Sequence, residues 1–191
     1  MKIIFATGNK DKLKEIKRIF EDTGYEVISM KEAGFDEDIE ETGETFEENS
    51  YIKAKAIWDK TGGLVMADDS GFMVDYLNGA PGVYSARYLG EDADYDTKCR
   101  GILKALGGVP KEKRGARFVS VITAILPDGR VLTAEGALQG IVNDRMEGEN
   151  GFGYDPILYI PKIGRTTAQI SMDEKNAISH RGKALKLMRE K

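Results

Sequence analysis

The chain has 191 residues, of which 41% are hydrophobic and 31% charged, and this composition excludes extensive disorder and suits one globular domain, predicted here as residues 1–191. The formal net charge of −4 excludes a uniformly basic surface, so we expect a small ligand in a cleft and no nucleic-acid partner. A single cysteine, Cys99, excludes an internal disulfide and a cysteine-rich metal site.

The N-terminal segment predicts a strand, a glycine-containing loop and a helix. Residues 3–6 form an apolar run, residues 7–12 read TGNKDK, and apolar residues such as Leu13 and Ile16 then recur at helical spacing until Gly24. The apolar run is too short for a signal peptide, and no later run approaches the length of a membrane span. We therefore expect a cytoplasmic protein without membrane contact.

The following segments continue the alternation of strands and helices. Strands are predicted over residues 25–30, 64–69 and 72–77, an acidic loop begins at residue 37, and helices are predicted over 45–62 and 94–108. The first of these helices opens with a capping box, because Thr45 precedes Glu48 by three residues.

The second half of the chain has an extended, β-branched character. Residues 116–126 and 130–140 flank the turn signal PDG, which predicts a long hairpin. A final helix carries the apolar residues Leu185, Leu187 and Met188 and has basic residues near its C-terminal end. The predicted fold is α/β, an elongated mixed sheet with helices at both ends that forms two lobes with a central substrate cleft.

The loop TGNKDK is a candidate phosphate site. It joins a strand to a helix N-terminus, where free N–H groups and the helix dipole attract anions, and Gly8 would let the backbone approach a ligand. Lys10 and Lys12 near the helix start favour this interpretation, because cations there oppose the dipole unless an anion offsets them. The alternative is an ordinary capped turn, since the GxxxxGK[ST] pattern is absent.

Charged residues in the next elements suggest a cation site. Asp68 and Asp69 are adjacent at the predicted end of a strand, where ligands of α/β sheets usually bind, and an extended chain would point them to opposite sides. Glu41 in the acidic loop supplies another carboxylate, and Mg²⁺ prefers one or two carboxylates plus substrate phosphates. Asn49 and Lys53 share a helix face with apolar residues, so Lys53 either snorkels to water or points at a polyphosphate. The alternative for the two aspartates is an Asx-turn.

The C-terminal third offers groups suited to a nucleobase. Phe152 and Tyr154 stand between glycines and are free to stack, and Lys175, His180 and Arg181 bring cationic donors. The alternative is a bulged strand followed by a helix capped by Ser179, with a structural histidine.

These motifs closely resemble those of the inosine and xanthosine triphosphate pyrophosphatases, which remove non-standard purine nucleotides. The matching stretches, in order, are TGNKDK, EETGETFEENSYIKAKA, ADDSGFMVDYLNGAPGVYSARY, GFGYDP and SHRGKAL, and they extend over nearly the whole chain. The resemblance implies Mg²⁺-dependent attack of water on the α-phosphorus of inosine, deoxyinosine or xanthosine triphosphate (ITP, dITP, XTP), giving the monophosphate and pyrophosphate. It also implies a two-lobed α/β fold and a homodimer.

The resemblance further implies a role for each matching residue. Glu41 and Asp69 would bind the metal, and Asp69 would be the proton acceptor, with Asp68 shaping or supporting the site. Substrate contacts would come from Thr7, Gly8, Asn9, Lys10, Asp11, Lys12, Asn49, Lys53, Ser70, Phe152, Gly153, Tyr154, Asp155, Lys175, His180 and Arg181.

One position departs from the family pattern, because Met146 stands where relatives often have a proline before GFGYDP. Two other functions stay open. A nucleotide sensor would keep the pocket without turnover, but would have little need of Glu41 and Asp69. A hydrolase of pyrimidine or methylated nucleotides would match GFGYDP and SHRG poorly. A panel of triphosphates distinguishes these functions.

Overall fold

The computed structural model describes residues 1–36 and 38–191, so Glu37, the first residue of the predicted acidic loop, lies outside the described residues. In the described part, strands form one mixed seven-stranded sheet in the order β2-β1-β3-β4-β5-β6-β7. β1 pairs in parallel with β2 and β3, whereas β6 pairs antiparallel with β5 and β7. The strands are β1 (Lys2–Phe5), β2 (Glu26–Ser29), β3 (Val65–Val74), β4 (Gly115–Ile125), β5 (Val131–Val142), β6 (Leu158–Ile160) and β7 (Arg165–Thr166). The predicted mixed α/β sheet is confirmed.

The helices are α1 (Lys10–Phe20), α2 (Phe46–Thr61), α3 (Tyr95–Ala105), α4 (Met172–Ile178) and α5 (His180–Arg189). Local chemistry explains where α2 begins and ends. The predicted capping box is present, since Thr45 Oγ1 accepts from Glu48 N and the Glu48 side chain accepts from Thr45 N. Gly62 ends the helix with φ of 61°, a conformation that glycine adopts without strain. In the described residues, no helix is long and apolar enough to cross a membrane.

The described chain divides into two compact units. Unit 1 comprises residues 1–69, 120–136 and 180–191, and unit 2 comprises residues 70–119 and 137–179. The strands β3, β4 and β5 each contribute residues to both units. The two predicted lobes correspond to these units, and the predicted cleft stays a prediction.

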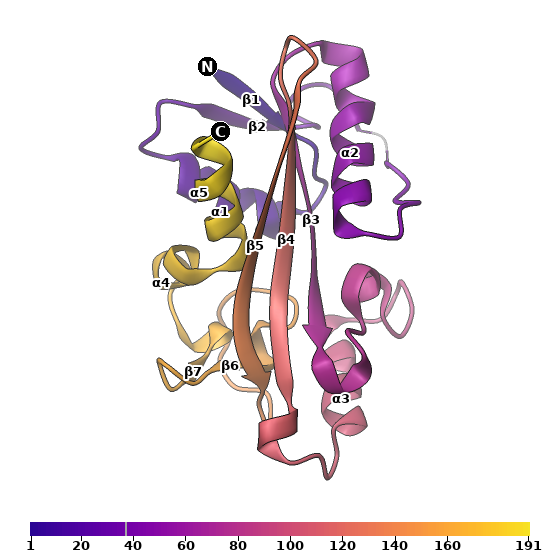
Figure 1. Ribbon diagram of the computed structural model, residues 1–191, viewed down its shortest axis with the longest axis vertical. Helices are drawn as coiled ribbons and strands as arrows, with labels where there is room; N and C mark the ends of the chain where they lie inside the picture. The colour runs from indigo at the N-terminus through magenta and orange to yellow at the C-terminus, as the bar shows by residue number, and fades with distance from the viewer. Residues whose placement is uncertain (37) are drawn as a thin grey trace. The chain divides into compact units, whose positions relative to one another are not determined.

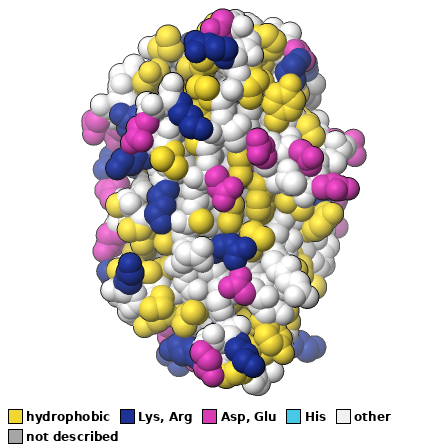
Figure 2. All heavy atoms as spheres, in the orientation of Figure 1, with side chains coloured by type: hydrophobic (Ala, Val, Ile, Leu, Met, Phe, Trp, Pro, Cys, Tyr) yellow, Lys and Arg dark blue, Asp and Glu magenta, His cyan; other side chains and the backbone are white. Residues whose placement is uncertain are grey.

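Each unit buries its own apolar side chains. In unit 1, α1 packs beside α5, and Ile16 and Phe20 of α1 join Leu185 and Met188 of α5 in one cluster (Figure 1). In unit 2, side chains of α3 pack against those of β3, β4 and β5 around residues such as Phe72. Charged side chains of both signs are interspersed on the face drawn in Figure 2, as expected for a surface without a uniform basic character.

The predictions of a strand end after Asp69, of an Asx-turn, and of a separate strand over residues 72–77 are wrong. β3 runs without interruption from Val65 to Val74, and a 3₁₀ turn (Asp75–Leu77) follows it. The strand continues because both aspartates find cationic partners on its two faces, so neither carboxylate has to fold back onto the backbone. The pair of carboxylates therefore lies in the middle of a long, buried strand.

The predicted hairpin is confirmed, since β4 and β5 are neighbours in the sheet. Its turn is closed by hydrogen bonds between Leu126 and Arg130 and from Gly129 to Leu126. The predicted final helix is confirmed as α5, which begins directly after the extended residue Ser179, whereas the short helix α4 before it is not among the predicted elements. Leu187 is 45% exposed, because it lies on the opposite face of α5 from the buried Leu185.

Candidate active site

The residues predicted to bind substrate or metal fall into both units. Unit 1 contains Thr7, Gly8, Asn9, Lys10, Asp11, Lys12, Glu41, Asn49, Lys53, Asp69, His180 and Arg181, and unit 2 contains Ser70, Phe152, Gly153, Tyr154, Asp155 and Lys175. Lys10 and Asp11 are exposed, and Ser70 is half-buried directly after Asp69. The structure thus brings most of the phosphate-side and metal-side residues together in unit 1.

The loop between β1 and α1 is folded by its own polar side chains. Asn9 caps α1, because its Oδ1 accepts hydrogen bonds of 3.0 Å from the backbone N–H of Asp11 and of Lys12. Thr7 Oγ1 accepts from Asn9 N at 3.2 Å. A Cβ added at Gly8 would meet no atom within 4 Å. Packing therefore does not demand glycine there, and close approach of a ligand stays its predicted reason.

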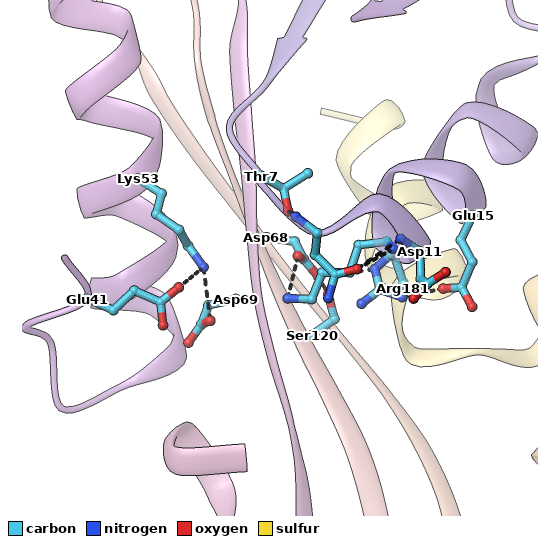
Figure 3. A network of polar contacts seen from close by, with 11 residues as sticks. Thr7, Asp11, Glu15, Glu41, Lys53, Asp68, Asp69, Ser120 and Arg181 are labelled. Atoms are coloured by element: carbon cyan, nitrogen blue, oxygen red, sulfur yellow. Dashed lines mark hydrogen bonds and ion pairs between the residues drawn. The ribbon is translucent and has the colours of Figure 1, made fainter. Parts of the chain in front are cut away.

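Asp68 points from β3 toward α1 and α5 and is 1% exposed (Figure 3). Its Oδ1 lies 2.9 Å from Lys12 Nζ. Its Oδ2 accepts from Arg181 Nε at 3.1 Å and from Ser120 Oγ at 3.3 Å. Arg181 is itself 1% exposed and also donates from Nη1 to Glu15 Oε2. A buried chain of alternating charges thus links Glu15, Arg181, Asp68 and Lys12.

The electrostatics of Asp68 make it a fixed anion. Burial alone would raise the pKa of the Asp68 carboxyl, but the charges of Lys12 and Arg181 outweigh burial and hold the pKa well below its usual range. A carboxylate in this state is a poor proton acceptor near neutral pH. Its position suits it to hold Lys12 and Arg181 in place.

Asp69 points to the other side of β3, as Figure 3 shows, and is 5% exposed. Its Oδ1 accepts from Lys53 Nζ at 3.0 Å, and the same ammonium donates to Glu41 Oε1 at 2.6 Å. Lys53 therefore does not snorkel to water, because its ammonium lies between the two carboxylates. The predicted opposite orientation of Asp68 and Asp69 is confirmed.

Burial determines the direction of the pKa shift of Asp69, whereas in Lys53 the effect of burial is opposed by nearby carboxylates. Burial raises the pKa of Asp69, and the opposing attraction of Lys53 and Lys12 does not cancel the rise. Burial would lower the pKa of Lys53, but the charges of Asp69 and Glu41 raise it above its ordinary value. The two adjacent aspartates thus have opposite pKa shifts, and the role of Asp69 as proton acceptor stays a prediction.

Asn49 lies beside this cluster on α2 but contacts the acidic loop. Its Oδ1 accepts from Gly43 N at 2.8 Å, and its Nδ2 donates to Gly43 O at 3.3 Å. The side chain is fully buried. Its role as a substrate contact stays a prediction, and the structure gives its amide two backbone partners.

In unit 2, Asp155 organises the GFGYDP stretch. Its Oδ2 accepts from Lys175 Nζ at 2.6 Å and from Phe152 N at 2.9 Å, and its Oδ1 accepts from Thr167 Oγ1 at 2.8 Å. Lys175 Nζ also lies 4.9 Å from the centroid of the Phe152 ring. A Cβ at Gly151 would collide with the Asp155 carboxylate, and Gly151 has a φ of 73°, so this position requires glycine. The carboxylate anchors both the aromatic residue and the lysine.

Tyr154 belongs to the core of unit 2. Its ring stacks on Phe72 with centroids 5.0 Å apart, and its hydroxyl donates to Ser85 O at 2.8 Å. The ring is therefore already used in packing, and of the two aromatic residues Phe152 is the half-buried one. The predicted stacking of a base stays a prediction, with Phe152 as the better-placed ring.

The side chains of Glu41 and Asp69 fit a Mg²⁺ ion. Among the described residues, Asp69 Oδ2 is buried without a hydrogen-bond partner. The Glu41 carboxylate lies nearby, because both carboxylates bind the Lys53 ammonium. Over residues 1–36 and 38–191, no group of three or more His, Cys, Asp or Glu side chains is placed to hold a metal. A cation held by the two carboxylates would therefore need further oxygen ligands from water or substrate, which is typical of Mg²⁺.

Sequence reasoning missed Glu15 and Ser120, which complete the surroundings of Arg181 and Asp68. Glu15 had a signal, because it lies three residues after Lys12 and so on the same face of α1. Ser120 lies inside the apolar run of β4, where a hydroxyl needs a buried partner. Neither signal identifies the partner, which comes from a distant part of the chain.

The chain is similar to a known protein family over almost its whole length. The model of the Ham1 family matches residues 3–191. The dITP/XTP pyrophosphatase of Caldanaerobacter subterraneus subsp. tengcongensis is 52% identical over 191 residues, which cover 100% of this chain and 95% of that protein. The dITP/XTP pyrophosphatase of Bacillus subtilis is 48% identical over 183 residues, covering 96% and 92%. The structure of the Staphylococcus aureus Ham1 protein matches with a TM-score of 0.88 and 43% identity, covering 100% of this chain and 97% of that chain.

Proposed function

The chain belongs to the Ham1 family, and from this premise we propose that it hydrolyses ITP, dITP and XTP to the monophosphate and pyrophosphate with Mg²⁺ as cofactor. The observation that carries the proposal is identity of 52% to a dITP/XTP pyrophosphatase over the full 191 residues. The arrangement of carboxylates and lysines in unit 1 supports hydrolysis of a phosphoric anhydride, because it combines a metal-binding pair, fixed cations and a helix N-terminus.

Glu41 and Asp69 would hold the Mg²⁺ ion. When bound, Mg²⁺ neutralises phosphate charge and favours the ionised form of a bound water. Asp69 would also be the proton acceptor, as the family resemblance implies, and its Oδ2, buried without a hydrogen-bond partner among the described residues, is the oxygen open to a ligand. Lys53 balances the two carboxylates and carries positive charge to the phosphate side.

The β1–α1 loop and Lys12 would bind the phosphate chain. The N-terminus of α1 supplies backbone N–H groups, and Asn9 holds the first turn in shape. Asp68 fixes the Lys12 ammonium, and Arg181 in turn fixes Asp68. This buried support keeps the cation in position before a nucleotide arrives, so less ordering is needed on binding.

The base would be recognised by the Phe152 ring and by the Lys175 ammonium, with Asp155 holding both. Hypoxanthine and xanthine carry an oxygen at position 6 that accepts a hydrogen bond, whereas adenine carries an amino donor. A buried donor left without an acceptor costs about 1–3 kcal/mol or more. The proposed site therefore favours the oxo purines over adenine, and guanine would be rejected through its 2-amino group.

Two further properties are proposed with the function. One is a homodimer, which the family resemblance implies, and the other is a cytoplasmic location, which the short N-terminal apolar run predicts. Light scattering coupled to size-exclusion chromatography tests the dimer, since the chain has a mass of 21.1 kDa.

The decisive experiment is a panel of triphosphates with Mg²⁺, analysed by ³¹P NMR for pyrophosphate and monophosphate. We expect kcat/KM for ITP, dITP and XTP to exceed that for ATP and GTP by roughly 100-fold or more. The margin against GTP is the smaller one, because a steric fit discriminates less than a missing hydrogen bond. Binding without turnover would support the sensor function, and preference for pyrimidine nucleotides would contradict the proposed base site.

A further inference from the structure

The acidic loop that carries Glu41 is fastened to the start of α2 by the amide side chain of Asn49. Gly43, two residues after Glu41, donates its backbone N–H to Asn49 Oδ1 at 2.8 Å. Its carbonyl accepts from Asn49 Nδ2 at 3.3 Å. One side chain therefore binds both polar groups of a single residue in a segment without regular secondary structure.

The packing around this contact leaves little freedom. A Cβ added at Gly43 would come within 2.6 Å of Glu48 Cβ and 2.7 Å of Asn49 Oδ1, so only glycine allows the approach. The next two residues are fixed as well, because the N–H groups of Glu44 and Thr45 donate to Glu48 Oε2 at 2.7 and 3.1 Å. The backbone that follows Glu41 is thus held by consecutive hydrogen bonds to α2.

We propose that Asn49 is a positioning residue that holds Glu41 opposite Asp69 for the cation, and that it is not itself a phosphate ligand; the inference rests on the proposed function. Two observations carry it. Asn49 is 0% exposed, and both polar atoms of its amide are occupied by Gly43. Lys53 lies one helical turn further along α2 and donates to both carboxylates, so α2 orients Glu41 from two points.

Loss of the contact between Asn49 and Gly43 should weaken the binding of the metal ion. Residues that orient metal ligands through hydrogen bonds typically change metal affinity or activity by about 10–100-fold when they are replaced. If Glu41 is held only by Lys53, its carboxylate samples more positions and the cation binds more weakly. Saturating Mg²⁺ should then restore turnover, because Asp69 and the phosphate-side cations are unchanged.

The test compares two variants with a matched control. Asn49→Ala removes the amide, and Gly43→Ala breaks the same contact from the other side by steric conflict while Asn49 stays intact. Ser50→Ala is the control, because Ser50 is equally buried on the same helix and its hydroxyl contacts Thr123 Oγ1 at 2.7 Å and Glu47 O, away from the acidic loop. The measurements are Mn²⁺ binding to the nucleotide-free protein by electron paramagnetic resonance, the Mg²⁺ concentration for half-maximal pyrophosphate release, and KM for ITP at saturating Mg²⁺.

Both loop variants should weaken Mn²⁺ binding and raise the half-maximal Mg²⁺ concentration by about 10-fold or more, with kcat largely recovered at saturating Mg²⁺. Ser50→Ala should retain the wild-type metal dependence even if it unfolds at a lower temperature. If Asn49→Ala raises KM for ITP and leaves both metal measurements unchanged, Asn49 is a phosphate ligand and the inference is overturned. The same holds if both loop variants behave like Ser50→Ala.

Gly43→Ala keeps the test valid if Asn49→Ala does not fold. If the proposed function is wrong, wild type and Ser50→Ala will also lack Mg²⁺-dependent pyrophosphate release. In that case the inference about Asn49 is wrong as well.

Discussion

Replacing Arg181 by methionine should destabilise the protein strongly. Methionine keeps much of the apolar stem and removes the guanidinium, which bonds to Glu15 and Asp68 at a position 1% exposed to solvent. The variant leaves two carboxylates in the interior with one cationic partner fewer. Removing one member of a buried ion pair costs about 3–5 kcal/mol, because the remaining charge is buried without compensation.

This cost translates into a measurable change in melting temperature. For a chain of this size each kcal/mol lowers Tm by roughly 2–4 °C, so Arg181→Met should melt about 6–20 °C below wild type. Adding Glu15→Gln should recover part of the loss, since it neutralises one stranded carboxylate. The two substitutions should therefore be strongly non-additive.

The deficit should also depend on pH. The pKa of Asp68 is lowered in the folded wild type, and the charge of Arg181 contributes to this. A lowered folded-state pKa adds stability above the unfolded-state pKa of about 3.9, and this stability is lost as pH falls. The difference between wild type and Arg181→Met should thus be largest near neutral pH and should shrink below about pH 4.

Urea unfolding followed by circular dichroism at pH 7 and at several pH values below about 4 measures both effects. A loss below about 1 kcal/mol at pH 7 would refute the reasoning, because it lies well under the range for a broken buried ion pair. A deficit that does not change with pH would mean that lost packing, and not charge, accounts for the loss.

Two further predictions concern the lysines and the cysteine. Lys12→Ala and Lys53→Ala should raise KM for ITP and XTP alike, as expected for phosphate contacts, and a changed preference between the two bases in steady-state kinetics would place the affected lysine at the base. Cys99 is 0% exposed and burial raises its pKa to about 12, so the thiol stays protonated at pH 8 and reacts slowly. A thiol-specific chromogenic reagent should label it slowly in the native protein and fully in denaturant, and rapid native labelling would contradict this burial.

Local patterns in the sequence were enough to predict much of the fold. The capping box at Thr45 and Glu48, the turn around Gly129 and the apolar spacing of α1 are encoded within a few residues, and each is present. The predicted end of β3 is wrong because the strand is stabilised by residues that are distant in sequence. Two adjacent aspartates followed by serine and glycine favour a turn locally, and only partners such as Lys12 and Lys53 keep the chain extended.

The candidate site was predictable in its residues and less so in their partners. Opposite orientation of Asp68 and Asp69 follows from the period of a strand, and the structure confirms it. The pairing of Arg181 with Asp68 joins residues 113 positions apart, and no local pattern contains such information. The sequence neighbourhood of Arg181 predicts a role at the base, and that role stays a prediction beside its observed contacts in unit 1.

Asp68 and Asp69 are proposed to have different roles, and paired amide substitutions test this difference directly. Turnover of ITP at saturating Mg²⁺ should be measured for Asp69→Asn and Asp68→Asn, together with nucleotide binding and circular dichroism to verify folding. Asp69→Asn should bind nucleotide but lose about 10²-fold or more in kcat, the contribution typical of a proton acceptor. Asp68→Asn should act mainly through KM and stability, because its carboxylate holds Lys12 and Arg181. An Asp69→Asn enzyme that keeps more than about a tenth of the wild-type kcat, or equal losses in the two variants, would contradict the account.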